Sequence, residues 1–165
     1  MIGIVSVFQV HDLFESDSRL IEKIISFWRI NMKAFGVKKL IIVNIDHLPV
    51  SCGDLEIEFE VYDSLEEVLK KYSNYTFVFL ECAQKEVDGI DFIPLKDFKH
   101  PEGDVLYIFG SDYSVLNLTE LKEKGYLENN FVVSIETETN IPLWAHTAMS
   151  IVLYDRKVKL SDSNK

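Results

Sequence analysis

The sequence predicts an α/β protein, a three-layer sandwich in which helices cover both faces of a mostly parallel sheet. Near-continuous apolar runs, such as 2–10 and 105–109, are typical of strands buried on both faces. Segments with helical spacing of apolar residues alternate with these runs along the chain. Because only a few residues join the first predicted helix to the second strand, a right-handed parallel crossover is expected.

The first half of the chain contains local signals for each boundary. Its predicted elements are a strand at 2–10, a helix that Asp17 or Ser18 begins and that reaches about Phe35, a strand at 37–44, a strand at 54–62, and a helix that Asp63 or Ser64 caps and that continues through Lys71. Gly36 follows the first helix at the position that glycine favours. Strict alternation of apolar and acidic residues over 54–62 indicates a half-exposed strand near a sheet edge.

The second half continues the alternation. Its predicted elements are a strand at 75–81, an extended segment at 90–95, a strand at 105–109, a helix at about 118–124 ended by Gly125, a strand at 131–135 and a helix at about 142–154. The last helix is apolar on nearly every side, so something must cover it. It is either a core helix or one shared between the sheet and a second subunit. Residues 1–157 are expected to form one domain, and 158–165 a frayed polar tail.

Composition narrows the class of protein. The net charge of −10 opposes the approach of RNA, although basic residues concentrate in 19–39 and at the C-terminus. No apolar run approaches the ~20 residues that cross a bilayer. Cys52, Cys82 and four scattered histidines show neither metal-ligand spacing nor a disulfide framework, so a reducing cytoplasm is the expected compartment.

The usual phosphate-binding and hydrolase motifs are missing from the sequence. It has no G-x-G-x-x-G after its first strand, no P-loop and no G-x-S-x-G. Two loops remain, Gly110–Ser111–Asp112 after the strand at 105–109 and residues 136–140 after the strand at 131–135. The carboxyl ends of parallel strands are where α/β sheets bind ligands, although Gly110 by itself also fits a plain turn.

Three segments carry a resemblance to a known family. Ala34–Phe35–Gly36–Val37 precedes an apolar strand, with Arg29 upstream, one residue further from Gly36 than is usual in that family. The family's F-G-x-E-x-x-G-L reads here F-G-S-D-Y-S-V-L over 109–116, and its I-V-L-Y-E reads I-V-L-Y-D over 151–155. On these segments, residues 2–156 resemble the SPOUT superfamily of RNA methyltransferases, most closely its minimal 2′-O-ribose methyltransferases.

The resemblance implies a C-terminal trefoil knot that binds S-adenosylmethionine. The residues it places against the cofactor are Leu80, Cys82, Phe109, Gly110, Ser111, Ile135, Thr137, Leu143 and Trp144. Arg29 and Asp112 are the implied catalytic residues. Candidate RNA contacts are Arg19, Lys33, Lys38 and Lys39. It further implies a tRNA or rRNA substrate and a homodimer through the first and last helices. No metal is expected, because the Cys and His residues lack metal-ligand spacing.

The chain also departs from the family pattern. Asp112 replaces a glutamate, Val115 replaces a glycine, and Pro142–Leu143–Trp144 stands where the family has S-L-N. These changes and the negative charge favour an alternative, a degenerate SPOUT-fold dimer that binds or scaffolds without catalysis. Trp144 either stacks on the adenine or a substrate base, or plugs the core or dimer interface. A flavodoxin-like binding domain without a knot is a third reading, which the apolar last helix disfavours.

Overall fold

The computed structural model describes residues 1–8, 18–43, 56–82, 89–111, 115–139 and 141–162, with the backbone alone at 18–21 and 162. One sheet runs through the molecule in the order β3-β2-β1-β6-β4-β7-β5, and every pairing in it is parallel. Its strands are β1 (Ile2–Val7), β2 (Lys39–Val43), β3 (Glu58–Tyr62), β4 (Thr76–Leu80), β5 (Ile93–Pro94), β6 (Val105–Gly110) and β7 (Phe131–Ser134).

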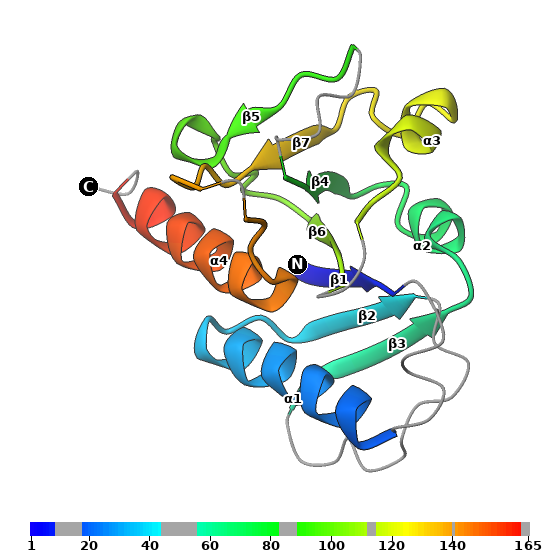
Figure 1. The fold of residues 1–165 in the computed structure, drawn as a ribbon, viewed down its shortest axis with the longest axis vertical. Helices are drawn as coiled ribbons and strands as arrows, with labels where there is room; N and C mark the ends of the chain where they lie inside the picture. The colour runs from blue at the N-terminus through cyan, green and yellow to red at the C-terminus, as the bar shows by residue number, and fades with distance from the viewer. Residues whose placement is uncertain (9–17, 44–55, 83–88, 112–114, 140, 163–165) are drawn as a thin grey trace.

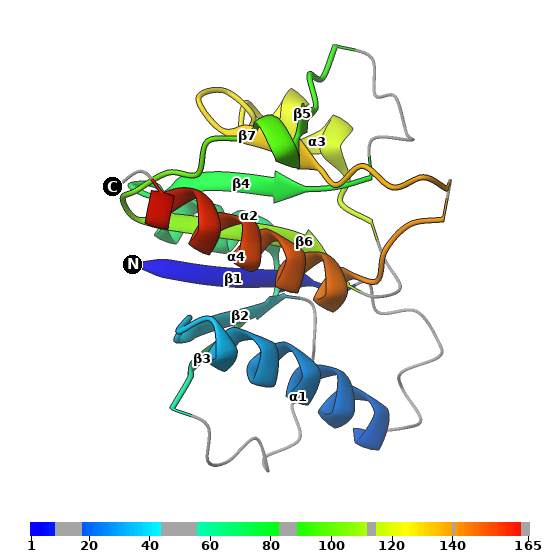
Figure 2. The same ribbon diagram turned by 90° about the vertical axis from the view of Figure 1, so that its left-hand side faces the viewer.

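Helices cover both faces of this sheet, which confirms the predicted three-layer α/β class (Figure 1). The long helices α1 (Ser18–Ala34) and α4 (Ala145–Asp162) lie side by side on one face, as Figure 2 also shows. The short helices α2 (Leu65–Lys71) and α3 (Leu118–Glu123) pack on the other. Each face has its own apolar core, because strand residues alternate between the two sides.

Strand β6 lies at the centre of the architecture. It pairs with β1 on one side and with β4 on the other, and all six of its residues are buried. The apolar run at 105–109 therefore occupies the position that its composition predicts. Because β6 inserts between two strands that precede it in sequence, the carboxyl ends of β4, β6 and β7 are brought next to one another.

Local signals in the sequence mark the observed helix ends. The Ser64 hydroxyl accepts a hydrogen bond from the Glu67 N–H at 3.3 Å and caps α2. Gly36 follows α1 with a φ of 70°, and Gly125 follows α3 with a φ of 77°. These left-handed conformations disfavour residues with a Cβ, so the two glycines set where the helices stop.

The last helix differs from the prediction at both ends. It begins at Ala145, so Pro142, Leu143 and Trp144 precede it, and it continues past Tyr154 to Asp162. The extension is held by hydrogen bonds from its polar side. Arg156 Nη1 donates to the Pro101 carbonyl at 2.5 Å, and Lys159 Nζ donates to the Leu95 carbonyl at 2.6 Å. The division into a domain ending at 157 and a tail stays a prediction.

Strand β3 is an edge strand as expected, and the predicted alternation holds through Phe59 but breaks at Glu60 and Val61. Val61 is exposed and Glu60 is largely buried, because the Glu60 carboxylate accepts hydrogen bonds from Lys39 and Tyr72. A polar cluster therefore occupies part of the strand face that was expected to be exposed to solvent. The trefoil knot stays a prediction, since residues 112–114 and 140 lie outside the described part of the chain.

A buried histidine links α4 to the sheet. The His100 side chain is 0% exposed, with Nδ1 2.7 Å from the Tyr107 hydroxyl and Nε2 2.9 Å from Asp155 Oδ2. Burial lowers the pKa of His100 below its usual value, although the hydrogen bond to Asp155 opposes this shift. Burial also raises the pKa of Tyr107 to about 12, so its hydroxyl stays protonated and able to donate to Nδ1. The geometry fits a neutral imidazole that carries its proton on Nε2.

We expect the free energy of unfolding to fall as the pH is lowered from 7 to 5. The unfolded histidine binds a proton near pH ~6.5, whereas the folded one resists protonation, so acid favours the unfolded state in this window. Urea unfolding at pH 7, 6 and 5 measures the slope, and His100→Gln should flatten it. Equal slopes for the wild type and the variant would contradict this account.

Candidate functional site

A cleft of about 440 Å³ opens where the carboxyl ends of β4, β6 and β7 meet the segment that leads into α4. Its size falls within the ~300–1,000 Å³ typical of small-molecule sites. The lining residues are Leu80, Glu81, Cys82, Phe109, Gly110, Ser111, Val115, Val133, Ile135, Thr137, Ile141, Pro142, Leu143, Trp144, Ala145 and Ala148.

Strand register sets the base of this cleft. Leu80 is paired with Phe109 on one side and with Val133 on the other, so three apolar side chains from neighbouring strands stand in one row. The backbone of Gly110 follows directly, and its carbonyl accepts a hydrogen bond from the Ser6 hydroxyl at 3.3 Å. An apolar base beside backbone groups at the strand ends suits a flat heterocycle with polar edges.

The outer wall is an extended segment rich in exposed apolar residues. Ile141 and Trp144 are 72% and 54% exposed. The Trp144 ring meets the His146 ring edge-on at 5.8 Å between centroids, and His146 stacks on Phe27 of α1 at 5.6 Å. A row of aromatic rings thus runs from the cleft to α1. The proline at 142 suits this extended entry to the helix, which begins only at Ala145.

Glu81 ties three segments of the cleft together. Its backbone N–H donates to the Val133 carbonyl at 3.1 Å. Its carboxylate accepts the Cys82 N–H at 2.8 Å and the Leu116 N–H at 2.7 Å. The residues after β4 are therefore joined to the segment that precedes α3. Charge-assisted bonds of this kind are stronger than neutral ones.

The structure brings together all nine residues that the family resemblance places against a cofactor, from Leu80 to Trp144, because each lines the cleft. Their role as ligands of a cofactor stays a prediction. Sequence reasoning did not single out Glu81 or Val133. The available signal was positional, since Glu81 directly follows a buried apolar strand, but its hydrogen bond to Leu116 depends on a contact 35 residues away.

Of the two predicted catalytic residues, the structure describes Arg29 but not Asp112. Arg29 lies on α1, is 5% exposed, and is not among the residues that line the cleft of this single chain. Asp112 lies outside the described residues. Their catalytic roles stay predictions.

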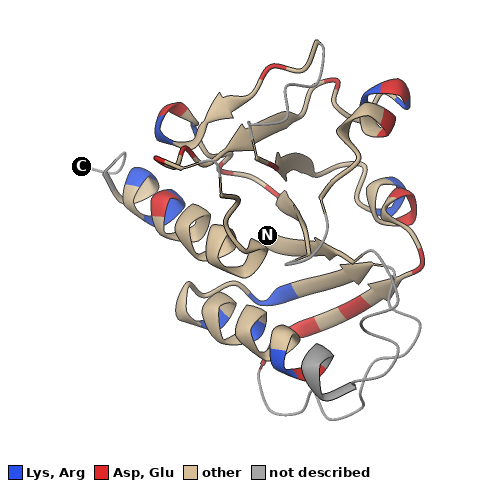
Figure 3. Cartoon of the chain, in the orientation of Figure 1, with Lys and Arg blue, Asp and Glu red and all other residues tan. Residues whose placement is uncertain are grey.

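Of the four predicted RNA contacts, two have exposed side chains in the structure. Lys33 and Lys38 are exposed near the end of α1 and before β2, at the amino edge of the sheet and away from the cleft. Figure 3 shows this basic region along α1, and acidic residues on the neighbouring β3. Arg19 is in the first turn of α1, and its side chain lies outside the described part. Lys39, the fourth predicted contact, is buried.

Lys39 is a structural residue rather than a phosphate contact. Its side chain is 7% exposed, and Nζ lies 2.7 Å from Glu58 Oε1 and 2.8 Å from Glu60 Oε1. Burial alone would raise the pKa of Glu60, but hydrogen bonds from Lys39 and from its tyrosine and lysine neighbours lower that pKa to about 2. The positive charge of Lys39 is thus balanced by two carboxylates of the same protein. Its place next to Lys38 in sequence gave no sign of this.

Replacing Lys39 with methionine should lower the free energy of unfolding by about 3 kcal/mol, because Glu60 then loses its most buried cationic partner. Lys38→Met is the matched control, since Lys38 is exposed, and should change stability by less than ~0.5 kcal/mol. Urea denaturation at pH 7 measures both. A Lys39→Met protein as stable as the Lys38→Met protein would contradict the assignment.

Among the described residues, no group of three or more His, Cys, Asp or Glu side chains is arranged to hold a metal ion. None of the helices in the described ranges is long and apolar enough to cross a membrane.

No family model matches the chain, and no curated protein matches it in sequence. Solved structures do match it. A "probable methylase family protein" from Haemophilus influenzae Rd KW20 has a TM-score of 0.68 at 19% identity, over 99% of this chain and 68% of the other. The TrmH/SpoU tRNA modifying enzyme of A. aeolicus has a TM-score of 0.65 at 14% identity, over 98% of this chain and 76% of the other.

A third match comes from a structure that describes the 2-OH methylation of C/U34 on tRNA. Its TM-score is 0.67 at 15% identity, over 97% of this chain and 91% of the other. The chain therefore has the fold of the SPOUT RNA methyltransferases of the SpoU and TrmH kind, as the sequence resemblance implied. At these identities the likeness establishes the fold alone.

Proposed function

We propose that this protein is an RNA methyltransferase that uses S-adenosylmethionine and acts on a ribose 2′-hydroxyl of tRNA or rRNA. The observation that carries the proposal is the cleft, because it lies at the carboxyl ends of β4, β6 and β7 and contains the residues that the family resemblance selects. The named activities of the structural neighbours support the same class. A cytoplasmic location accords with such a substrate.

The cleft suits this cofactor. Leu80, Phe109 and Val133 offer an apolar surface for the adenine ring, and the backbone around Gly110 and Ile135 offers donors and acceptors for its edges. Binding through backbone groups tolerates the side-chain differences at 112, 115 and 142–144. The cofactor would supply the methyl group, and the protein would hold the ribose oxygen in line with it, so positioning accounts for much of the rate.

Arg29 and Asp112 are the proposed catalytic residues. Arg29 is assigned to the ribose hydroxyl or its phosphate, because a guanidinium offers a planar fork of donors. Lys33 and Lys38 are proposed to contact the RNA backbone, together with Arg19. Their distance from the cleft of the same chain means that this assignment depends on the assembly.

Calorimetric titration with S-adenosylmethionine and S-adenosylhomocysteine tests the cofactor site. We expect micromolar dissociation constants for both ligands. No heat of binding at millimolar ligand would refute the cofactor assignment.

Arg29→Lys tests the catalytic assignment while retaining a positive charge at a buried position. We expect methyl transfer to RNA to fall at least ~100-fold, with cofactor affinity changed less than about twofold, because the variant loses the fork but not the cleft. Transfer of a radioactive methyl group measures the rate. Unchanged turnover would remove Arg29 from the mechanism.

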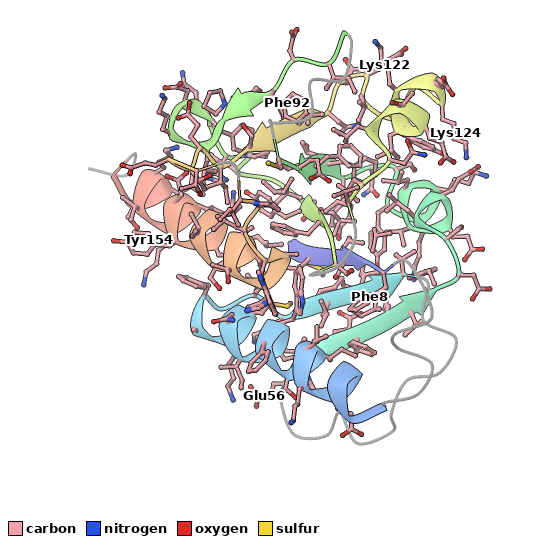
Figure 4. All side chains as sticks on the ribbon, in the orientation of Figure 1. Phe8, Glu56, Phe92, Lys122, Lys124 and Tyr154 are labelled. Atoms are coloured by element: carbon pink, nitrogen blue, oxygen red, sulfur yellow. The ribbon has the colours of Figure 1, made fainter. Side chains whose placement is uncertain are left out.

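A homodimer through α1 and α4 is the proposed assembly. Ile151, Tyr154 and Val158 form an exposed apolar stripe along α4, and Phe27 and Ile30 are exposed on the adjoining α1. Figure 4 shows Tyr154 on the outer side of its helix. An apolar surface that spans two helices on one face is typical of an interface.

We expect Ile30→Lys to yield a monomer, because it introduces a charge at the centre of this surface. Glu123→Lys, which places the same side chain on α3 across the sheet, is the matched control and should stay dimeric. Equilibrium sedimentation at micromolar concentration distinguishes them. A monomeric wild type would contradict the proposed assembly.

A second candidate function is a non-catalytic binding protein with the same fold. Trp144, which lines the cleft and stands in the S-L-N position, favours it by removing polar groups from the helix entry. In this case the cleft would bind no S-adenosylmethionine.

A further inference from the structure

The carboxylate of Glu81 is the distinctive chemical group of the cleft. Among the described lining residues it is the one acidic side chain, and none of them is lysine, arginine or histidine. Most of the others are apolar, and the remainder are neutral polar groups such as Ser111 and Thr137. The described wall of the cleft therefore carries a negative charge.

This charge is held in one place. The Cys82 and Leu116 N–H groups each donate to a different carboxylate oxygen, at 2.8 and 2.7 Å, and the Glu81 N–H is anchored on Val133. A carboxylate accepts up to about four hydrogen bonds, and the described residues donate two to Glu81. A fixed carboxylate does not need to reorganise when a ligand enters.

The surroundings make the charge effective. Apolar walls displace water, and the effective dielectric constant for a group in such a position is ~20 rather than ~80. A ligand cation several ångströms from the carboxylate is then favoured over a neutral group of the same shape. S-adenosylmethionine and its product differ by the transferred methyl group and by charge, because the sulfonium is positive and the thioether is neutral.

We propose that Glu81 is the residue that lets the cleft prefer S-adenosylmethionine over S-adenosylhomocysteine, through the interaction of its fixed carboxylate with the sulfonium. The inference rests on the proposed function. It identifies Glu81 as a specificity-determining residue that promotes release of the product after methyl transfer. The residue lies outside the family motifs and follows from the contacts of this chain.

Glu81→Gln tests the proposal, because the amide keeps the shape of the side chain and removes its charge. Calorimetry at ~0.15 M salt, where the screening length is ~8 Å, should be run with three ligands. These are S-adenosylmethionine, S-adenosylhomocysteine and sinefungin, which carries an amine at the sulfonium position. We expect the dissociation constants of the two cationic ligands to rise about tenfold and that of S-adenosylhomocysteine to change less than about twofold.

Two variants control for structure and for long-range charge. Glu81→Asp keeps the charge on a shorter side chain and should retain the preference, even where all three affinities fall. Glu136→Gln removes an exposed carboxylate that is paired with Lys96 outside the cleft lining, and should leave the ratios unchanged. Thermal unfolding of each variant establishes that it is folded.

The outcomes separate the two claims. A parallel loss of all three affinities in Glu81→Gln would give Glu81 a structural role only and overturn the inference, while the cofactor site would stand. Unchanged affinities would overturn it equally. A wild-type protein that binds none of the three ligands would overturn both the inference and the proposed function.

Discussion

The pairing of β6 with β1 on one side and β4 on the other is the constraint on which the rest of the molecule depends. It places a fully buried strand at the centre of the sheet. The rows of apolar residues on β6 divide between the two cores, so α1 and α4 are held on one face and α2 and α3 on the other. The base of the cleft uses the same pairing, because β6 places Phe109 beside Leu80, and β7 places Val133 on the other side of Leu80.

The charged residues of β3 and those of α1 have different surroundings. The acidic residues of β3 are used within the protein, where Glu58 and Glu60 pair with Lys39 and Glu60 also pairs with Lys71, so this cluster adds little to the net charge of −10. On the opposite face, α1 carries exposed lysines and an exposed apolar stripe. The total charge is therefore a poor guide to the potential that an RNA would meet, since buried pairs contribute little to the field outside.

Much of the fold was predictable from the sequence, because it depends on local patterns. Interactions between residues close in sequence specify several elements and their ends. Examples are the apolar runs at 2–10 and 105–109, the serine at 64 and the glycines at 36 and 125. The burial of Lys39 and Glu60 was not predictable, since a lysine beside Lys38 and an alternating acidic strand both indicate solvent. The start of the last helix was also misplaced, because apolar residues at 142–144 suit a helix as well as the wall of a cleft. Family resemblance selected the cleft residues, whereas the bridge made by Glu81 required the three-dimensional contact with Leu116.

The most direct test of the central claim is an amide NMR titration of the assigned protein with S-adenosylhomocysteine. The account predicts that the largest shifts fall on Leu80–Cys82, Phe109–Ser111 and Ile135–Thr137, the three strand ends that meet at the cleft, with smaller shifts at Leu143 and Trp144. Residues at the amino edge of the sheet, such as Lys38, should not move. Shifts confined to that edge, or no shifts at millimolar ligand, would contradict the claim that this cleft is a cofactor site.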